Sequence, residues 1–304
     1  MGNKKQKVLA VGSVALDTVK TPFGKAERAL GGSATFFSAS ARFFSDVSVV
    51  AVVGEDFPQK HLQLLKNLKI DTRDLKVASG KTFHWEGLYS YDLNNPKTLK
   101  TELNVFEHFK PVLSDENRSQ RFVFLANIDP EIQLTVLKQV RNPLFSACDT
   151  MNFWIGTKKK ALLSLLKNVD IFLCNDGEAR QLSGEYGLLQ AAKWILSRGP
   201  KLLVIKKGEH GVTCFSKKFT FVAPAYPLEQ VFDPTGAGDS FAGGFISYLT
   251  RSHNLDEATV RKAVIYGSVL ASYNVESFSL NRLVSLKPSE IDSRYEHFKE
   301  LTKF

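Results

Sequence analysis

Short apolar runs alternate with helical patterns along most of the chain. Residues 8–12 form a short apolar run, and residues 48–53 form a β-branched run without polar alternation. Such a run is typical of a strand that is covered on both faces. Between them, residues 33–44 follow Gly31-Gly32 and are small and apolar, which predicts a buried helix. The first part of the chain is therefore expected to fold as strand, helix and strand.

The same alternation continues in the second half. Strands are predicted at 122–125, 144–147, 169–173 and 202–205, and helices between them at 131–140, 158–166 and 187–196. An antiparallel pair is expected over 211–221, and three helices close the chain at 238–250, 256–274 and 288–299. Short apolar strands alternating with helices predict an α/β fold with a mostly parallel central sheet and helices on both faces.

Residues 82–103 interrupt this pattern. Apolar and aromatic residues mix with polar ones over 82–92, Asn94-Asn95-Pro96 forms a turn, and residues 97–103 return. This predicts an antiparallel hairpin with one exposed face, which we interpret as a small appended sheet. Trp85 in that hairpin either packs its apolar face or stacks on a ligand. The sequence shows no repeat, linker or composition shift, so we expect a single domain over 1–304.

Composition narrows the class of protein. The 304 residues are 43% hydrophobic and 23% charged, which excludes intrinsic disorder. A chain of this length buries roughly three quarters of its unfolded surface. No apolar run approaches the roughly 20 residues that span a bilayer, so we expect no membrane partner. The three cysteines lie far apart without metal-ligand spacing, which favours reduced thiols and a cytoplasmic location.

The net charge of +9 is compatible with nucleic acid, with a polyanionic small molecule or with a solvated basic surface. No nucleic-acid-binding motif accompanies the charge, so we expect no nucleic-acid partner.

The most informative segment is 233–245, DPTGAGDSFAGGF. Two glycines flank Ala237, and a long helical pattern then begins. Such a turn exposes unpaired backbone N–H groups at a helix N-terminus, where the helix dipole also favours a phosphate. Asp239 lies in the same first turn. An acid there also complements the dipole without any catalytic role, and the local pattern alone leaves both interpretations open.

Two other phosphate-binding motifs are excluded. A Walker A loop ends in Gly-Lys-Thr, as Gly80-Lys81-Thr82 does, but Leu75 stands where its first glycine belongs. A dinucleotide fingerprint matches Gly236 and Gly238 but meets Phe241 at its third glycine.

Taken together, the motifs resemble those of the ribokinase-like (PfkB) carbohydrate kinase family over nearly the whole chain. Residues 233–239 match the family's DxxGAGD signature, and Gly31-Gly32 resembles its N-terminal glycine pair. Residues 53–56 resemble its next strand end, 175–178 its NxxE motif, and 207–211 its nucleotide loop. The resemblance implies a ribokinase-like three-layer fold and an ATP-dependent kinase that phosphorylates a hydroxyl of a sugar or sugar-like substrate.

The resemblance also implies roles for the DxxGAGD residues and for the substrate side of the site. Asp239 would be the general base that takes the proton of the substrate hydroxyl. The amides of Gly236, Ala237 and Gly238 would form the anion hole. Substrate contacts would come from Asp17, Gly31, Gly32, Phe36 and Trp85. A lid would be formed by about residues 14–30 and 80–105, and lids of this family sometimes also form homodimer contacts.

Further roles implied by the resemblance concern the nucleotide. Asn175 and Glu178 would organise Mg²⁺ and the ATP phosphates, with Glu178 as the residue nearest the metal. Lys206, Gly208 and Gly211 would lie along the nucleotide. Asp233 would shape the anion hole, beside a monovalent cation such as K⁺ in many relatives. Asp149, which follows a predicted strand, either approaches the phosphates or caps a helix.

The chain departs from the family pattern at two positions. The family usually places Asn four residues after the second glycine, where it bonds a sugar hydroxyl, and here that residue is Phe36. An aromatic ring cannot make that bond, so the acceptor stays open between a sugar and a nucleoside. The family often has Thr at position 206, where Lys206 either contacts a phosphate or is a strand-end surface charge. A catalytically silent ligand-binding sensor on the same fold is the alternative of another class.

Overall fold

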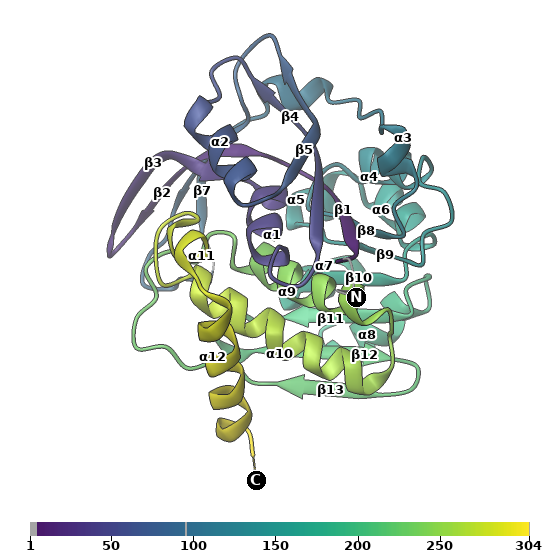
Figure 1. The fold of residues 1–304 in the computed structure, drawn as a ribbon. Coiled ribbons are helices and arrows are strands. Elements are labelled where there is room, and N and C mark those ends of the chain that lie inside the picture. The colour runs from purple at the N-terminus through teal and green to yellow at the C-terminus, as the bar shows by residue number, and fades with distance from the viewer. Residues whose placement is uncertain (1–4, 95, 304) are drawn as a thin grey trace.

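A mixed sheet forms the centre of the computed structural model, which describes residues 5–94 and 96–303 (Figure 1). Within the described residues the strand order is β13-β12-β11-β10-β9-β8-β1-β4-β5. Neighbouring strands from β11 to β5 pair in parallel, and only β12 and β13 are antiparallel. The strands are β1 Lys7–Val11, β4 Asp46–Gly54, β5 Asp71–Ala78, β8 Phe122–Leu125, β9 Phe145–Cys148, β10 Ile171–Asn175, β11 Leu202–Lys206, β12 Val212–Ser216 and β13 Thr220–Ala223.

Helices cover both faces of this sheet, and alternate strand residues belong to two separate cores. In β1, Val8 and Ala10 pack in one core while Leu9 and Val11 pack in the other. The helices of the first face are α1 Ser33–Ala41, α2 Gln59–Asn67, α9 Ala237–Ser252, α10 Glu257–Asn274, α11 Asn281–Ser285 and α12 Pro288–Leu301. The second face carries α4 Pro130–Leu137, α5 Asn152–Thr157, α6 Lys159–Leu166, α7 Asp176–Ser183 and α8 Leu188–Leu196. Burial on both faces explains why these strands lack polar alternation.

A second sheet stands beside the first, in the order β3-β2-β6-β7. Its strands are β2 Ala15–Thr21, β3 Gly24–Gly31, β6 His84–Leu88 and β7 Lys97–Glu102. Strands β6 and β7 form the predicted antiparallel hairpin, and β2 pairs with β6 in parallel. We call these four strands the lid sheet.

The predicted α/β architecture is confirmed, and the remaining differences have local causes. The polar run 71–78 gave no strand signal, but it forms β5 at the sheet edge, where pairing on one side tolerates charged residues. The short helices α5 and α7 were not predicted, because they span only six and eight residues, too few for a helical period to show. A short helix, α3 Asp115–Arg118, and a 3₁₀ turn, Asn104–His108, precede β8.

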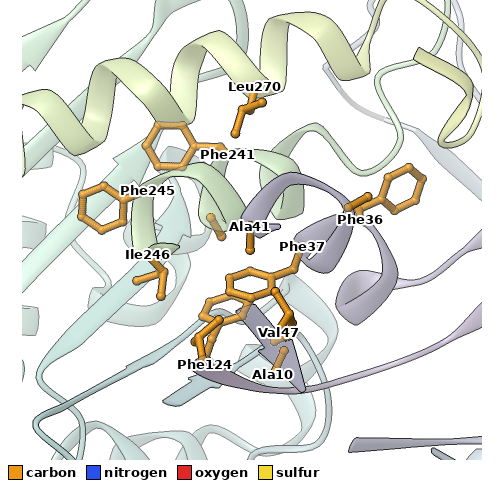
Figure 2. Packing of buried hydrophobic residues seen from close by; sticks show 14 of the residues in the cluster. Ala10, Phe36, Phe37, Ala41, Val47, Phe124, Phe241, Phe245, Ile246 and Leu270 are labelled. Carbon is orange, nitrogen blue, oxygen red and sulfur yellow. The ribbon is translucent and has the colours of Figure 1, made fainter. Parts of the chain in front are cut away.

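Close packing of α1 against α9 fixes the N-terminus of α9 over the sheet. Phe37 of α1 stacks on Phe124 of β8, with ring centroids 4.2 Å apart, and Figure 2 shows Phe245 and Ile246 of α9 around the same core. Gly243 lies against the backbone carbonyl of Phe37 and leaves no room for a side chain. The pair Gly243-Gly244 therefore lets α9 approach α1 closely, and α10 on its other side.

We expect Gly243→Val to destabilise the protein, because its side chain would push α9 away from α1. Overpacking of this kind typically costs about 1–3 kcal/mol. Thermal unfolding should show a lower Tm than wild type. Gly156→Ala, in α5, is the matched control, because the nearest atom to its new Cβ is 3.7 Å away. An unchanged Tm for Gly243→Val would contradict the packing role assigned to this glycine.

All three cysteines, Cys148, Cys174 and Cys214, are buried and unpaired, and burial raises the pKa of each thiol. Within the described residues no helix has the length and apolar character needed to cross a membrane.

Candidate active site

The DPTGAGD segment forms a tight loop that leads directly into α9. Gly236 adopts a left-handed backbone, with φ 75°, and precedes the first helical residue, Ala237. The carboxylate of Asp233 accepts the N–H of Thr235 at 2.9 Å and that of Ser279 at 3.2 Å. Asn274 of α10 donates its Nδ2 to the carbonyl of Thr235 at 2.8 Å. These bonds hold the loop from both sides.

The loop leaves two amides at the start of α9 without a partner inside the helix. Ala237 N donates to Pro234 O at 3.1 Å, and Ser240 N donates to Gly236 O at 2.8 Å. The amides of Gly238 and Asp239 lie between these two, in the first turn, where no preceding carbonyl of the helix can reach them. Gly236, Ala237, Gly238 and Asp239 are all half-buried. A phosphate group can therefore approach the N-terminus of α9.

Asp239 lies in this half-buried turn rather than sealed in the core. Burial and the charge of Asp149 raise the pKa of its carboxyl and Lys206 opposes them, with a net pKa of about 7. A carboxyl with a pKa near neutrality exchanges protons at physiological pH, which a general base requires.

Lys206 is part of a charged cluster at the carboxyl ends of β9, β10 and β11. Its Nζ lies 2.5 Å from Asp149 Oδ2 and 3.1 Å from the position of a Cβ on Gly238. Burial alone would lower the pKa of this ammonium, but the charges of Asp149 and Glu178 outweigh burial and raise it. Lys206 is therefore a largely buried cation directed at the start of α9, and the interpretation as a surface charge is wrong.

The NxxE residues form a reciprocal capping box at the start of α7. Asn175 Oδ1 accepts the N–H of Glu178 at 2.7 Å, and Glu178 Oε2 accepts the N–H of Asn175 at 2.7 Å. Burial raises the pKa of the Glu178 carboxyl, Lys206 lowers it and Asp149 raises it, with a net pKa of about 7. The capping box positions Glu178 beside Lys206 and Asp149, and it uses only the Oε2 oxygen of the Glu178 carboxylate.

Asp17 of β2 and the glycine pair meet at the other side of the site. Asp17 Oδ2 accepts the N–H of Gly32 at 3.2 Å, and the same oxygen occupies the place of any side chain on Gly31. Gly32 has φ 95°, and a Cβ there would lie 2.5 Å from Ser13 O. Both glycines are therefore required by geometry. Burial raises the pKa of Asp17, the bond from Gly32 lowers it and the charges of Asp233 and Asp239 raise it, with a net pKa of about 7.

Phe36 packs against the DPTGAGD loop that leads into α9. It points away from the Phe37–Phe124 core (Figure 2), and its ring lies against the Cα of Gly236, so a side chain on Gly236 would overlap it. Phe36, Asp17, Asp233 and Thr235 line one small hollow between the lid sheet and the α9 loop. The apolar residues Val19, Ala26, Ala29 and Leu30 complete its wall.

Two aromatic residues, Trp85 in β6 and Tyr89 just after it, make different contacts. Trp85 pairs in register with Asp17, but its Nε1 donates to Thr98 Oγ1 at 3.3 Å and its ring covers Gly87. Trp85 therefore packs the lid sheet itself. Tyr89 instead reaches the site, where its hydroxyl accepts a bond from Thr235 Oγ1 at 3.3 Å. Burial raises the pKa of Tyr89.

The predicted nucleotide loop is the turn between β11 and β12. Gly208 and Gly211 have φ 54° and 82°, and Lys207 N donates to Gly211 O at 2.8 Å across the turn. Asn94, from the turn between β6 and β7, lies against Gly208, and its Nδ2 lies 3.5 Å from Glu209 Oε1. The lid sheet therefore contacts the nucleotide loop.

Several residues that hold the site had no sequence signal. Asn274 and Ser279 act through single hydrogen bonds that depend on the folding together of distant segments. The sequence left Asp149 between a place near the phosphates and helix capping. Its Oδ1 accepts the N–H of Thr150, which precedes α5, and no side chain caps that helix, so the capping interpretation is wrong. Its Oδ2 binds Lys206, and a role near the phosphates stays a prediction.

Comparisons with known proteins agree with this geometry. A family model described as pfkB family carbohydrate kinase matches residues 5–285. A cytidine kinase of Thermococcus kodakarensis is 29% identical over 256 residues, which cover 82% of this chain and 91% of that protein. A nucleoside kinase of Methanocaldococcus jannaschii is 25% identical over 290 residues, covering 91% and 93%. Its crystal structure superposes with a TM-score of 0.79 over 97% of this chain and 100% of that one, at 23% identity.

A third similar protein is a nucleoside kinase of Burkholderia thailandensis, whose structure holds ADP and inosine. It superposes with a TM-score of 0.79 at 20% identity, over 95% of each chain. The order of motifs, the ribokinase-like architecture and the match over residues 5–285 lead to one conclusion. The chain belongs to the pfkB family of carbohydrate kinases and is an ATP-dependent kinase of small molecules with a hydroxyl acceptor.

Proposed function

We propose that this protein transfers the γ-phosphate of ATP to a hydroxyl group of a nucleoside, with Asp239 as the general base. The observation that carries the proposal is the half-buried Asp239, with a pKa of about 7, beside two open amides and the buried ammonium of Lys206. Similarity to proteins named cytidine kinase and nucleoside kinase favours a nucleoside over a free sugar.

In the proposed mechanism the acceptor lies between Asp17 of the lid sheet and Asp239 at the start of α9. Asp17, which the Gly32 amide holds in place, accepts a hydroxyl group of the acceptor, and Asp239 takes the proton of the attacking hydroxyl. The amides of Gly238 and Asp239 stabilise the charge on the transferred phosphoryl group together with Lys206. Phosphoryl transfer asks a protein mainly for positioning and for charge stabilisation, and these residues supply both.

The residues at the strand ends fit a nucleotide-bound magnesium ion. Glu178 and Asn175 would hold Mg²⁺ through water, since the capping box fixes their position and leaves carboxylate oxygen beside Lys206. Within residues 5–94 and 96–303 no group of three acidic, histidine or cysteine side chains is arranged to hold a metal ion. Mg²⁺ commonly takes most of its oxygens from substrate phosphates and water. The ion would neutralise the phosphate charge.

The DPTGAGD loop also fits a monovalent cation such as K⁺. Asp233 is a buried carboxylate, and Asn274 Oδ1 is buried without a hydrogen-bond partner among the described residues. Both belong to the segments that hold the loop. We expect the rate in a K⁺ buffer to exceed that in an otherwise identical buffer with tetramethylammonium, a much larger cation. Equal rates in the two buffers would exclude a cation role for these residues.

The substrate class is tested by an ADP-release screen with ATP and Mg²⁺. Cytidine, adenosine, inosine and uridine form one arm, and ribose, fructose and inositol form the other. Turnover with at least one nucleoside, and with none of the free sugars at comparable kcat/KM, is the expected result. Turnover only with a sugar would overturn the nucleoside assignment, and the protein would then be a sugar kinase. Binding without turnover in either arm would favour the ligand-binding sensor.

The raised pKa of Asp239 gives a pH prediction. A base must be deprotonated, so kcat/KM for the acceptor should be low below pH 6 and rise through about pH 7 as Asp239 loses its proton. An unperturbed aspartate, with a pKa near 4, would give no such rise. The measurement is a pH–rate profile between pH 5 and 9. A profile that stays flat from pH 5 upward would contradict the environment assigned to Asp239.

The family's lid-to-lid dimer and the cytoplasmic location remain predictions for this chain. The mass in solution, by light scattering at micromolar concentration, distinguishes one copy from two. Replacement of Leu99, an exposed apolar residue of the edge strand β7, by Glu should dissociate a dimer that forms through the lid sheet.

A further inference from the structure

A second cavity, of about 280 Å³, opens at the opposite end of α1 from the candidate active site. Helix α1 begins beside Gly32 and ends at Ala41, and its nine residues span about 14 Å. The cavity lies where the C-terminal end of α1 meets the start of β4, the end of α2 and the link from α11 to α12. The residues that matter for its chemistry are Lys5, Arg42, Ser45, Asp46, Lys69 and Leu286.

The cations of this cavity lack counter-ions. Lys5, Arg42 and Lys69 come from three separate segments, and none of them forms an ion pair within the described residues. Lys5 Nζ lies 3.2 Å from the carbonyl of Arg42 and 3.5 Å from that of Phe43, which are carbonyls at the end of α1. Arg42 donates one guanidinium nitrogen to Leu283 O at 2.8 Å. Asp46, the one acidic residue of the lining, does not balance three cations.

Buried polar atoms in the same lining also lack partners. Arg42 Nε and Ser45 Oγ are buried without a hydrogen-bond partner among the described residues, and Ser45 is only 1% exposed. Burial lowers the pKa of the Arg42 guanidinium. A partly buried cation without a counter-ion is unfavourable, and proteins usually pair such a charge. Guanidinium groups favour planar, bidentate oxygen ligands such as phosphate and carboxylate.

The dipole of α1 does not rule out an anion here. The C-terminal end of a helix disfavours negative charge, but Lys5 already contacts the carbonyls at that end.

The volume of this cavity lies just below the range of about 300–1,000 Å³ that is usual for drug-sized ligands. A small ligand therefore fits better than a whole nucleoside triphosphate.

We propose that this cavity is a second binding site, for a phosphate group, which Arg42, Lys5 and Lys69 hold as either inorganic phosphate or a small phosphomonoester. The assignment is independent of the proposed function, because no residue of the cavity belongs to the candidate active site.

The test is isothermal titration calorimetry of the full chain in a phosphate-free buffer. The active site is first saturated with a non-hydrolysable ATP analogue and Mg²⁺, so that the open amides at the start of α9 do not add to the measured phosphate binding. Inorganic phosphate is titrated in one arm and ribose 5-phosphate in the other. Arg42→Gln removes the guanidinium, and the double variant Lys5→Gln/Lys69→Gln removes two exposed cations without touching the core. Lys217→Gln/Lys218→Gln, on the turn between β12 and β13, is the charge-matched control.

We expect one phosphate site per chain in wild type, at least tenfold weaker binding in both cavity variants, and a control within twofold of wild type. Tighter binding of ribose 5-phosphate than of phosphate would identify the ligand as a phosphomonoester, and equal or weaker binding would identify it as free phosphate. The proposal is overturned if neither ligand binds at millimolar concentration. It is equally overturned if binding is the same in wild type and in both cavity variants.

Discussion

Asp239→Asn should lower kcat by roughly 10²–10⁴, the usual contribution of a positioned general base. This corresponds to about 3–5 kcal/mol of barrier. The amide keeps the shape of the side chain but cannot accept the proton of the acceptor hydroxyl. The KM for ATP should change little, because the amides of Gly238 and residue 239 remain in place. The rate should be measured at pH 8 with an acceptor confirmed on wild type, where the wild-type carboxylate is deprotonated.

The same variant should fold normally. Burial and the charge of Asp149 disfavour the ionised form of Asp239, so a neutral amide removes an unfavourable charge from the site. Asp256→Asn is the matched control, because Asp256 caps α10 by accepting the N–H of Thr259, and asparagine caps a helix about as well. A folded Asp239→Asn protein that phosphorylates the acceptor at the wild-type rate would disprove the assignment of the base.

Lys206→Met should impair both catalysis and stability, because the ammonium contacts Asp149 and faces the start of α9. Loss of a charged hydrogen bond to a phosphate, worth about 1.5–3 kcal/mol, should lower kcat/KM for ATP by roughly 10–100-fold. Removing one partner of a buried ion pair should also cost about 3–5 kcal/mol of stability. The two effects are measured by steady-state kinetics and by denaturant unfolding.

A double variant separates the two roles of Lys206. Asp149→Asn/Lys206→Met removes both charges of the pair, so much of the lost stability should return. The kcat/KM for ATP should stay low if Lys206 contacts a phosphate. If ATP use recovers together with stability in the double variant, Lys206 has only a structural role.

The pH profile of Lys206→Met is a second readout. Lys206 holds the pKa of Asp239 down, against burial and Asp149. Without the ammonium the pKa rises, so the rising limb of the pH–rate profile should move to higher pH. A limb at the wild-type position would show that the two side chains are not coupled electrostatically.

The sequence predicted those parts of the fold that depend on local pattern. Apolar runs without alternation gave the buried parallel strands, because such strands are covered on both faces. The polar edge strand β5 gave no pattern of that kind. The lid hairpin β6–β7 was visible from its turn residues, whereas the parallel pairing of β2 with β6 joins segments far apart in the chain and leaves no local signal.

In the candidate site, too, local motifs could be predicted and contacts between distant segments could not. The glycine turn and Asp239 form one continuous motif, so their proximity could be predicted from the sequence alone. The contact of Lys206 with Asp149 joins residues 57 positions apart, and its direction became clear only from the arrangement of β9, β10 and β11. The sequence placed Trp85 on the correct strand, but it could not show that the Trp85 ring covers Gly87.

Transfer of phosphate to a nucleoside hydroxyl is the central claim, and ³¹P NMR of the wild-type protein with ATP, Mg²⁺ and a nucleoside tests it most directly. The proposed function predicts a new phosphomonoester signal on the nucleoside, with one ADP formed for each ester. If ATP and nucleoside both bind but no ester forms with any nucleoside of the panel, the protein is not the kinase proposed here.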